Sequence, residues 1–335
     1  MKRKATIIIL EIIILIMVLG SIGLCKSWER KNAQDTLQIL IVGDSISEGA
    51  GASDPAFKWY KYLAPYVEEQ YGKELEITNV SMGGNTSYAG YVRIMQLNQS
   101  PSYDLVIVCF GENDAEETFA TYYEQLLQTI VNKWCNCTII TILESSQRGY
   151  TPKIRDIQSL SLKYQTHIAD TIAAFKNSGM TYEELCEDGT HPNDEGQKVY
   201  FNEIVRVLDE IYLKSDTHEI KRLSESTYGK EISDVSPFCY YSREEFEEIS
   251  PLEWKIAITE DTNRIGIDYN RIPGEQAIEV FSDINEIWCY QYNWNYTFEQ
   301  RHIEVINSEK QYLNELIICF SSEEQLENFN GIIVE

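Results

Sequence analysis

Leu37-Gln38-Ile39-Leu40-Ile41-Val42-Gly43-Asp44-Ser45 is an apolar run that ends in a turn sequence. A short apolar run bounded in this way predicts a buried strand of a parallel sheet. In such folds, ligands and catalytic groups lie just beyond the carboxyl ends of the strands. Ser45 therefore occupies a position where a nucleophile would be presented, although a lone serine there is more often a helix cap or a turn residue.

A base for that serine occurs far downstream, in Asp188-Gly189-Thr190-His191-Pro192-Asn193. A serine hydroxyl needs an adjacent base to act as a nucleophile. The base in turn needs a third group that orients it and stabilises the imidazolium. Asp188 and His191 supply both from one loop. The chain has four histidines, and we expect structural roles for the remaining three, which are His167, His218 and His302.

Two further loops follow predicted strands. Asn79-Val80-Ser81-Met82-Gly83-Gly84-Asn85-Thr86 comes after the strand near 75–80, and Gly111-Glu112-Asn113-Asp114 comes after the strand at 105–110. Glycine lets a backbone N–H approach a ligand closely, and an asparagine amide can donate a hydrogen bond. Donors of this kind, aimed at a developing alkoxide, form an oxyanion hole. Each loop taken alone is also an ordinary turn sequence.

Together the four segments resemble the SGNH (GDSL) hydrolase family over about residues 36–213. Gly43-Asp44-Ser45 matches its nucleophile block and Gly84 its glycine block. Gly111-Glu112-Asn113-Asp114 matches its Gly-x-Asn-Asp block, and Asp188-Gly189-Thr190-His191 its Asp-x-x-His block. The resemblance implies a three-layer, flavodoxin-like α/β fold with a parallel five-stranded sheet in the order 2-1-3-4-5.

The resemblance also implies roles for single residues. Ser45 is the expected nucleophile, His191 the base and Asp188 its partner. The expected oxyanion donors are the backbone N–H groups of Ser45 and Gly84 and the side chain of Asn113. Gly83 is an alternative to Gly84, because the doubled glycine allows either register. Candidate substrate-binding residues are Asp44, Asn85, Thr86 and Glu112. Ser47 stands where a Gly-x-Ser-x-Gly elbow would need glycine, which argues against an α/β-hydrolase.

The implied activity is that of a serine esterase that works through an acyl-enzyme on Ser45. For a tethered family member with an added β-domain, we expect O-acetyl esters on a carbohydrate or cell-wall glycan as substrates. An O-acyltransferase with the same triad and a catalytically inactive, tethered carbohydrate-binding protein remain alternatives. We expect no cofactor and no metal, because no cysteine and histidine cluster has the spacing of a zinc site.

Composition and the N-terminus indicate the surroundings of the enzyme. The net charge of -25 argues against a nucleic-acid partner, because its phosphates would be repelled. Met1-Lys2-Arg3-Lys4 precedes an apolar segment, residues 5–24, that is long enough to span a bilayer. We therefore expect an anchor and tether over residues 1–31 in the cell membrane, with the catalytic domain extracytoplasmic, or secreted if the segment is cleaved.

The chain divides further into a hydrolase domain, residues 32–214, and a β-rich accessory domain, residues 215–335. In the first, helical spacing is predicted between strands, over 56–71, 87–98, 117–133, 152–165 and 195–213. In the second, six alternating segments predict a small antiparallel β-sandwich. Its aromatic residues form either a sugar-binding platform or, as we favour, part of an ordinary core with solvent-facing tyrosines: Trp288, Tyr290, Tyr292, Trp294 and Tyr296.

Overall fold

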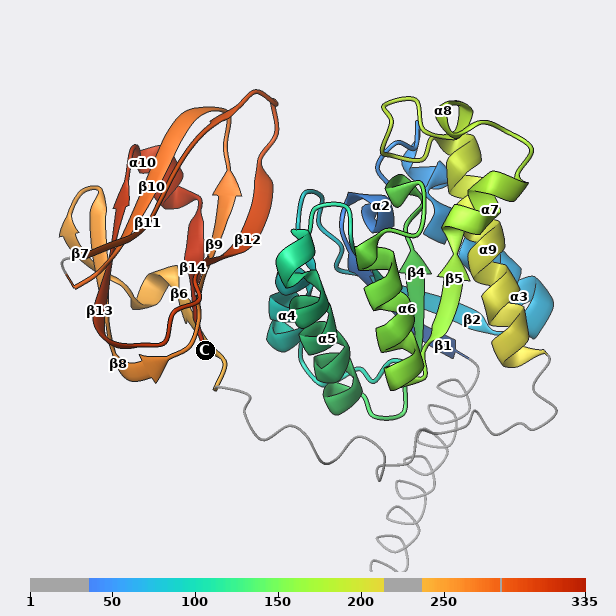
Figure 1. Cartoon of the computed structure of the whole chain (residues 1–335), viewed down its shortest axis with the longest axis horizontal. Coiled ribbons are helices and arrows are strands. Elements are labelled where there is room, and N and C mark those ends of the chain that lie inside the picture. The colour runs from blue at the N-terminus through green and yellow to red at the C-terminus, as the bar shows by residue number, and fades with distance from the viewer. Residues whose placement is uncertain (1–35, 214–236, 284) are drawn as a thin grey trace, which may run out of the picture.

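The computed structural model describes residues 36–213, 237–283 and 285–335 (Figure 1). The predicted anchor over residues 1–31, the predicted domain boundary at residues 214 and 215, and His218 lie outside these ranges. We call residues 36–213 the α/β domain and residues 237–335 the β domain. Among the described residues, none of the helices has the length and apolar character needed to cross a membrane.

The α/β domain is built on a parallel sheet in the order β2-β1-β3-β4-β5, which confirms the predicted order. Continuous burial of β1, β3 and β4 explains why these strands read as apolar runs rather than alternating ones. The strands are β1 (Thr36–Gly43), β2 (Glu74–Asn79), β3 (Leu105–Cys109), β4 (Thr138–Leu143) and β5 (His167–Asp170).

Successive strand residues point to opposite sides of this sheet, and those on both sides are apolar. Helices therefore cover both faces. Leu40 and Val42 pack in one apolar cluster with α4, α5 and α6, whereas Ile39 and Ile41 pack in another with α3 and α9. Figure 1 shows these two helical layers on either side of the sheet. The helices are α2 (Ser45–Glu48), α3 (Leu63–Tyr71), α4 (Ser87–Gln96), α5 (Glu116–Lys133), α6 (Pro152–Tyr164), α7 (Thr171–Asn177), α8 (Tyr182–Leu185) and α9 (Asp194–Tyr212).

The helix predicted over 56–71 is broken into three pieces. Two 3-10 turns, Pro55–Phe57 and Trp59–Tyr62, precede α3. The break falls at Lys58, whose backbone is extended, with φ -62° and ψ 135°. Directly after it, the Trp59 N–H donates to the Gln197 side chain at 2.9 Å instead of to a preceding carbonyl. A contact with α9 thus replaces one helical hydrogen bond.

The β domain is an antiparallel sandwich, as predicted. One sheet has the order β11-β10-β13-β8-β7 and the other β12-β9-β14-β6, with an apolar core between them. The six predicted strands correspond to β8 to β13, and β6, β7 and β14 are additional. The strands are β6 (Cys239–Ser242), β7 (Glu247–Ser250), β8 (Glu253–Thr262), β9 (Ile265–Arg271), β10 (Gly274–Ser282), β11 (Asn285–Trp294), β12 (Gln300–Asn307), β13 (Gln311–Phe320) and β14 (Phe329–Val334), with the short helix α10 (Glu323–Glu327) before the last.

The aromatic residues of β11 divide between core and surface. Trp288, Tyr290 and Tyr292 pack against the sandwich core, so for them the core interpretation holds. Beyond them, Tyr296 and Phe298 in the loop between β11 and β12 are more than half exposed. Both contact the Trp294 ring, Tyr296 at a tilt and Phe298 edge-on. In the β domain, exposed aromatic rings thus gather in this loop, with Tyr312 of β13 as a further exposed ring.

The two domains share an interface. Ile303 of β12 and Ile333 of β14 are fully buried in the apolar cluster of α4, α5 and α6. At the rim, Arg264 donates to the Gln125 side chain at 2.7 Å. Figure 1 shows β12 and β14 on the side of the β domain that faces α4 and α5. The four-stranded sheet of the β domain thus rests on one helical layer of the α/β domain.

Candidate active site

Ser45 is the first residue of α2 and follows directly on β1. Asp44 caps this short helix by accepting a hydrogen bond from the Ile46 N–H at 2.9 Å. A Cβ at Gly43 would collide with the Cys109 carbonyl of β3 and with Ser47, so this turn fits only with glycine. The strand end, the glycine and the cap together fix Ser45 beyond the carboxyl edge of the sheet.

The structure brings Ser45, His191 and Asp188 together although 146 positions separate the serine from the histidine. Ser45 Oγ lies 2.8 Å from His191 Nε2, and His191 Nδ1 lies 2.6 Å from Asp188 Oδ2. The second oxygen of Asp188 accepts the backbone N–H groups of Thr190 and His191 at 2.9 and 2.7 Å. This is the geometry of a nucleophile, its base and an orienting carboxylate.

The pKa of Asp188 is below its usual value. Burial acts to raise it, but the hydrogen bonds from the His191 ring and from the His191 and Thr190 backbone outweigh that effect. Asp188 is therefore an anion at neutral pH. In that form it accepts the proton of His191 Nδ1 and leaves Nε2 free to accept the proton of Ser45 Oγ.

Gln197 of α9 joins the segment that carries His191 to the segment that follows Ser45. Its buried amide donates to the Ala50 and Pro192 carbonyls at 3.0 and 2.9 Å, and its oxygen accepts the Trp59 N–H. Gly51, with φ +89°, lies so close that a Cβ there would be 2.9 Å from the His191 Cβ. These contacts fix the separation of His191 and Ser45. Neither Gln197 nor Gly51 was predicted from the sequence.

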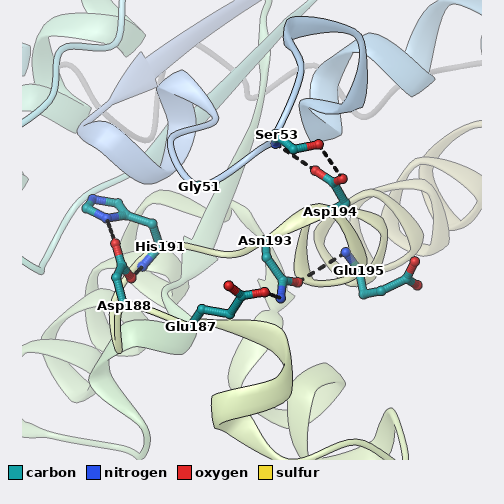
Figure 2. A pocket seen from close by; sticks show the side chains of 8 residues that line it. All are labelled: Gly51, Ser53, Glu187, Asp188, His191, Asn193, Asp194 and Glu195. Carbon is teal, nitrogen blue, oxygen red and sulfur yellow. Dashed lines mark hydrogen bonds and ion pairs between the residues drawn. The ribbon is translucent and has the colours of Figure 1, made fainter.

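A hollow of about 530 Å³ lies on one side of the Asp188–His191 pair (Figure 2). Two of its lining residues bond to each other: the Ser53 backbone N–H and hydroxyl donate to Asp194 at 2.8 and 2.6 Å. Its lining does not include Ser45, so we assign the ester-binding site to another side of His191. The lining residues are Gly51, Ser53, Glu187, Asp188, His191, Asn193, Asp194 and Glu195.

Two of the predicted oxyanion donors are backbone N–H groups, those of Ser45 and Gly84. No described residue accepts a hydrogen bond from the backbone N–H of Ser45 or of Gly84. The Gly83 N–H, in contrast, donates to Glu48 at 3.0 Å. Of the two registers that the doubled glycine allowed, the structure therefore favours Gly84, whose φ of +70° also suits glycine.

The Asn113 side chain lies between Asp44, in the turn after β1, and Asn85, in the loop after β2. Its Nδ2 donates to the Asn85 carbonyl at 3.1 Å and lies 3.4 Å from Asp44 Oδ2. Lys153 holds the Asn113 loop by donating to the Gly111 and Asp114 carbonyls. An amide nitrogen carries two hydrogens, and the one directed at Asp44 makes the longer bond, so a bound oxyanion would compete with Asp44 for it.

The four candidate substrate-binding residues have different environments. Asp44 is fully buried and acts as the cap of α2, and Asn85 is 1% exposed with its carboxamide bonded to backbone groups of β12. The structure thus assigns these two to internal hydrogen bonds rather than to substrate. Thr86 is half-buried at the start of α4. Glu112 is half-buried and accepts from Gln147 at 3.2 Å.

Buried carboxyl groups gather beneath the serine. Burial raises the pKa of Asp44 to about 7, with a further contribution from the nearby charge of Asp114. Burial, together with the charge of Asp44, also raises the pKa of Glu144 at the end of β4 well above its usual value. The Glu144 carboxyl accepts the Cys109 thiol at 3.2 Å. Two buried carboxyls that face each other cannot both ionise cheaply, so this pair retains a proton near neutral pH.

Two polar side chains beside Ser45 were not predicted. Glu48 lies one helical turn after Ser45, and that spacing could have indicated it. Gln300 comes from the β domain, and no sequence pattern links it to the serine. Among the described residues, one group of three potential metal ligands occurs, formed by Glu279, Glu286 and Cys289, and it shares no residue with the site above.

Comparisons with known proteins agree with this architecture. The model of the GDSL-like lipase/acylhydrolase family matches residues 41–199. An arylesterase from Vibrio mimicus is 26% identical over 173 residues, which are 49% of this chain and 84% of the relative. The crystal structure of a two-domain esterase active on acetylated mannans, co-crystallised with mannopentaose, matches with a TM-score of 0.67 at 16% identity. It covers 92% of this chain and 93% of its own, so the likeness in fold includes both domains. Residues 41–199 thus form a GDSL-like lipase/acylhydrolase domain, and the protein is a serine ester hydrolase.

Proposed function

We propose that this protein removes O-acetyl groups from a carbohydrate by way of an acyl-enzyme on Ser45. The observation that carries the proposal is the unbroken chain of contacts from Ser45 Oγ to His191 at 2.8 Å and from His191 to Asp188 at 2.6 Å. A serine hydroxyl becomes a nucleophile at neutral pH only with such a base in contact. In the described site, only Ser45 has that contact.

In the first half-reaction, Ser45 Oγ attacks the ester carbonyl while His191 Nε2 accepts its proton. The tetrahedral intermediate collapses, the bond to the alcohol oxygen breaks, and His191 passes the proton to that oxygen. In the second half-reaction, His191 accepts a proton from water, which attacks the acyl-enzyme. Collapse of that intermediate returns the proton to Ser45 Oγ and releases the carboxylic acid. Asp188 holds the imidazole orientation and stabilises its charged form throughout.

The developing oxyanion is stabilised by the two backbone N–H groups that have no described partner, those of Ser45 and Gly84, and by the Asn113 amide. Removal of one such donor in other enzymes costs about 2.7–4 kcal/mol of barrier. The donors are pre-positioned, because the left-handed backbone at Gly84 and the contact between Asn113 and the Asn85 carbonyl fix them before substrate binds.

Three observations support a carbohydrate as the acyl carrier. The two-domain esterase that shares the fold of both domains is active on acetylated mannans. In this chain, Tyr296 and Phe298 expose their rings in the loop that leads into β12, and exposed aromatic surface of this kind marks binding sites. The net charge of -25 further favours a neutral substrate over an anionic one.

The test is a pair of serine variants in the full chain, assayed on p-nitrophenyl acetate and for acetate release from acetylated mannan. Ser45→Ala should lower kcat by at least about 10³-fold on both substrates, because the nucleophile is lost. Ser47→Ala is the matched control, two residues away in the same helix, and should keep its activity. Retention of more than a few per cent of the wild-type rate by Ser45→Ala would refute the mechanism. Activity on p-nitrophenyl acetate without release from any acetylated glycan would refute the substrate class.

A further inference from the structure

The β domain reaches the active site through the first residues of β12. This strand lies at the edge of its sheet and pairs within that sheet with β9 alone. On its other side, Asn85 of the glycine loop takes the place of a neighbouring strand. Its Nδ2 donates to the Arg301 carbonyl at 2.8 Å, and its Oδ1 accepts the Ile303 N–H at 3.0 Å. An edge strand exposes unpaired backbone groups, and here a side chain satisfies two of them.

These two hydrogen bonds from Asn85 fix the start of β12 and with it the residue before Arg301, which is Gln300. A Cβ built on Gly84 would lie 3.0 Å from Gln300 Oε1, and one built on Gly83 would lie 3.0 Å from Gln300 Nε2. The same point on Gly83 is 3.5 Å from the Ser45 Cβ. The carboxamide of a β-domain residue therefore covers the oxyanion glycines next to the nucleophile.

The Gln300 carboxamide is unused by the protein. No described residue forms a hydrogen bond with its side chain, although the residue is only half-exposed. Polar groups at partly buried positions are generally hydrogen-bonded. A carboxamide offers two donor hydrogens and an acceptor oxygen. An acetyl methyl group could engage neither, whereas a sugar that carries the ester presents hydroxyl groups beside it.

We propose that Gln300 is a substrate-binding residue that hydrogen-bonds a hydroxyl group of the sugar whose ester is attacked by Ser45. This inference rests on the proposed deacetylation of carbohydrate. It makes the β domain part of the active site, since the domain supplies a contact to the leaving alcohol. Selectivity for esters of polyhydroxylated alcohols then depends on a residue outside the α/β domain.

The experiment compares Gln300→Leu with the wild-type full chain on acetylated mannooligosaccharides and on p-nitrophenyl acetate, whose leaving group has no hydroxyl beside the ester. Leucine keeps most of the volume and removes the hydrogen bonds. We expect kcat/KM on the oligosaccharide to fall roughly tenfold, mainly through KM, because about one neutral hydrogen bond is lost. The kcat/KM on p-nitrophenyl acetate should fall several-fold less than that on the oligosaccharide, because this ester offers Gln300 no hydroxyl group to bind. Gln291→Leu, at an exposed position of β11, is the matched control and should leave both substrates unaffected.

Equal losses on both substrates would overturn the proposal, because they would show a general effect on fold or chemistry. No loss on either substrate would overturn it as well. The proposed function is judged separately, by acetate release from the oligosaccharide by the wild-type chain. A wild-type enzyme that deacetylates the oligosaccharide while Gln300→Leu does so equally well would leave the proposed function intact and remove this inference alone.

Discussion

At the scale of single residues, the two buried carboxyls beneath Ser45 make stability depend on pH. The pKa of Asp44 is raised to about 7 and that of Glu144 is also raised, in both cases mainly by burial. Between about pH 4 and pH 7 the folded chain therefore holds protons that the unfolded chain has released. By linkage, the free energy of unfolding falls as the pH rises through this window.

Glu144→Gln tests that relation. The glutamine oxygen can still accept the Cys109 thiol, and its amide can donate to Asp44, so one ionisable group is replaced by a neutral donor. We expect the wild-type chain to lose stability between pH 5 and pH 8 and the variant to lose less. Urea unfolding at the two pH values measures the difference. A variant that loses as much stability as the wild type, or more, would contradict the assignment of the raised pKa to this pair.

A site residue can be predicted from the sequence when its immediate neighbours in the chain form a recognisable motif with it. Ser45 and Asn113 each stand in a short turn sequence after a predicted strand. Asp188 and His191 stand in a loop before a predicted helix, and the structure brings the triad residues together. Asp44 belongs to the same motif, but the sequence cannot tell that its side chain turns inward to cap a helix. Gln300 carries no local signal, because its position follows from the packing of one domain on another.

At the scale of elements, α9 links the histidine loop to the rest of the site through Gln197. Gln197→Leu would leave the Trp59 N–H and two backbone carbonyls without their partner in a buried place. An unsatisfied buried group costs about 1–3 kcal/mol, so we expect a clearly lower Tm. We also expect a lower kcat on p-nitrophenyl acetate, because the distance between His191 and Ser45 is no longer fixed. Lys198→Ala, the exposed neighbour on α9, should change neither quantity. Unchanged kcat in Gln197→Leu would show that the loops hold their positions independently.

Element prediction failed for the short helices, for the four-residue strands β6 and β7, and for β14, which is covered on both faces. The helices α2, α7 and α8 are too short for a 3.6-residue period to emerge. Strand β14 does not alternate, because its two faces are both covered: Ile332 packs in the sandwich core and Ile333 in the core of the α/β domain. The second cover is supplied by another domain and is therefore invisible in the pattern of the strand itself.

At the scale of the whole molecule, the apolar cluster that contains Ile303 and Ile333 joins the stability of the two domains. We expect a single calorimetric transition for the wild-type chain. Ile333→Ala should lower stability by about 2–5 kcal/mol and reduce the cooperativity between domains, because the side chain lies in the interface. Ile332→Ala removes the same atoms from the interior of the sandwich and should lower Tm without separating the transitions. Two resolved transitions in the wild type would contradict this coupling.

The carboxylates near Ser45 also affect what happens after the ester bond is broken. Substrate ester and sugar are neutral, but the acid that leaves becomes an anion at neutral pH. It forms beside Glu48, within a protein of net charge -25. Like charges repel at these distances. The anion therefore binds weakly at the site, and we expect little inhibition of the enzyme by its own acid product.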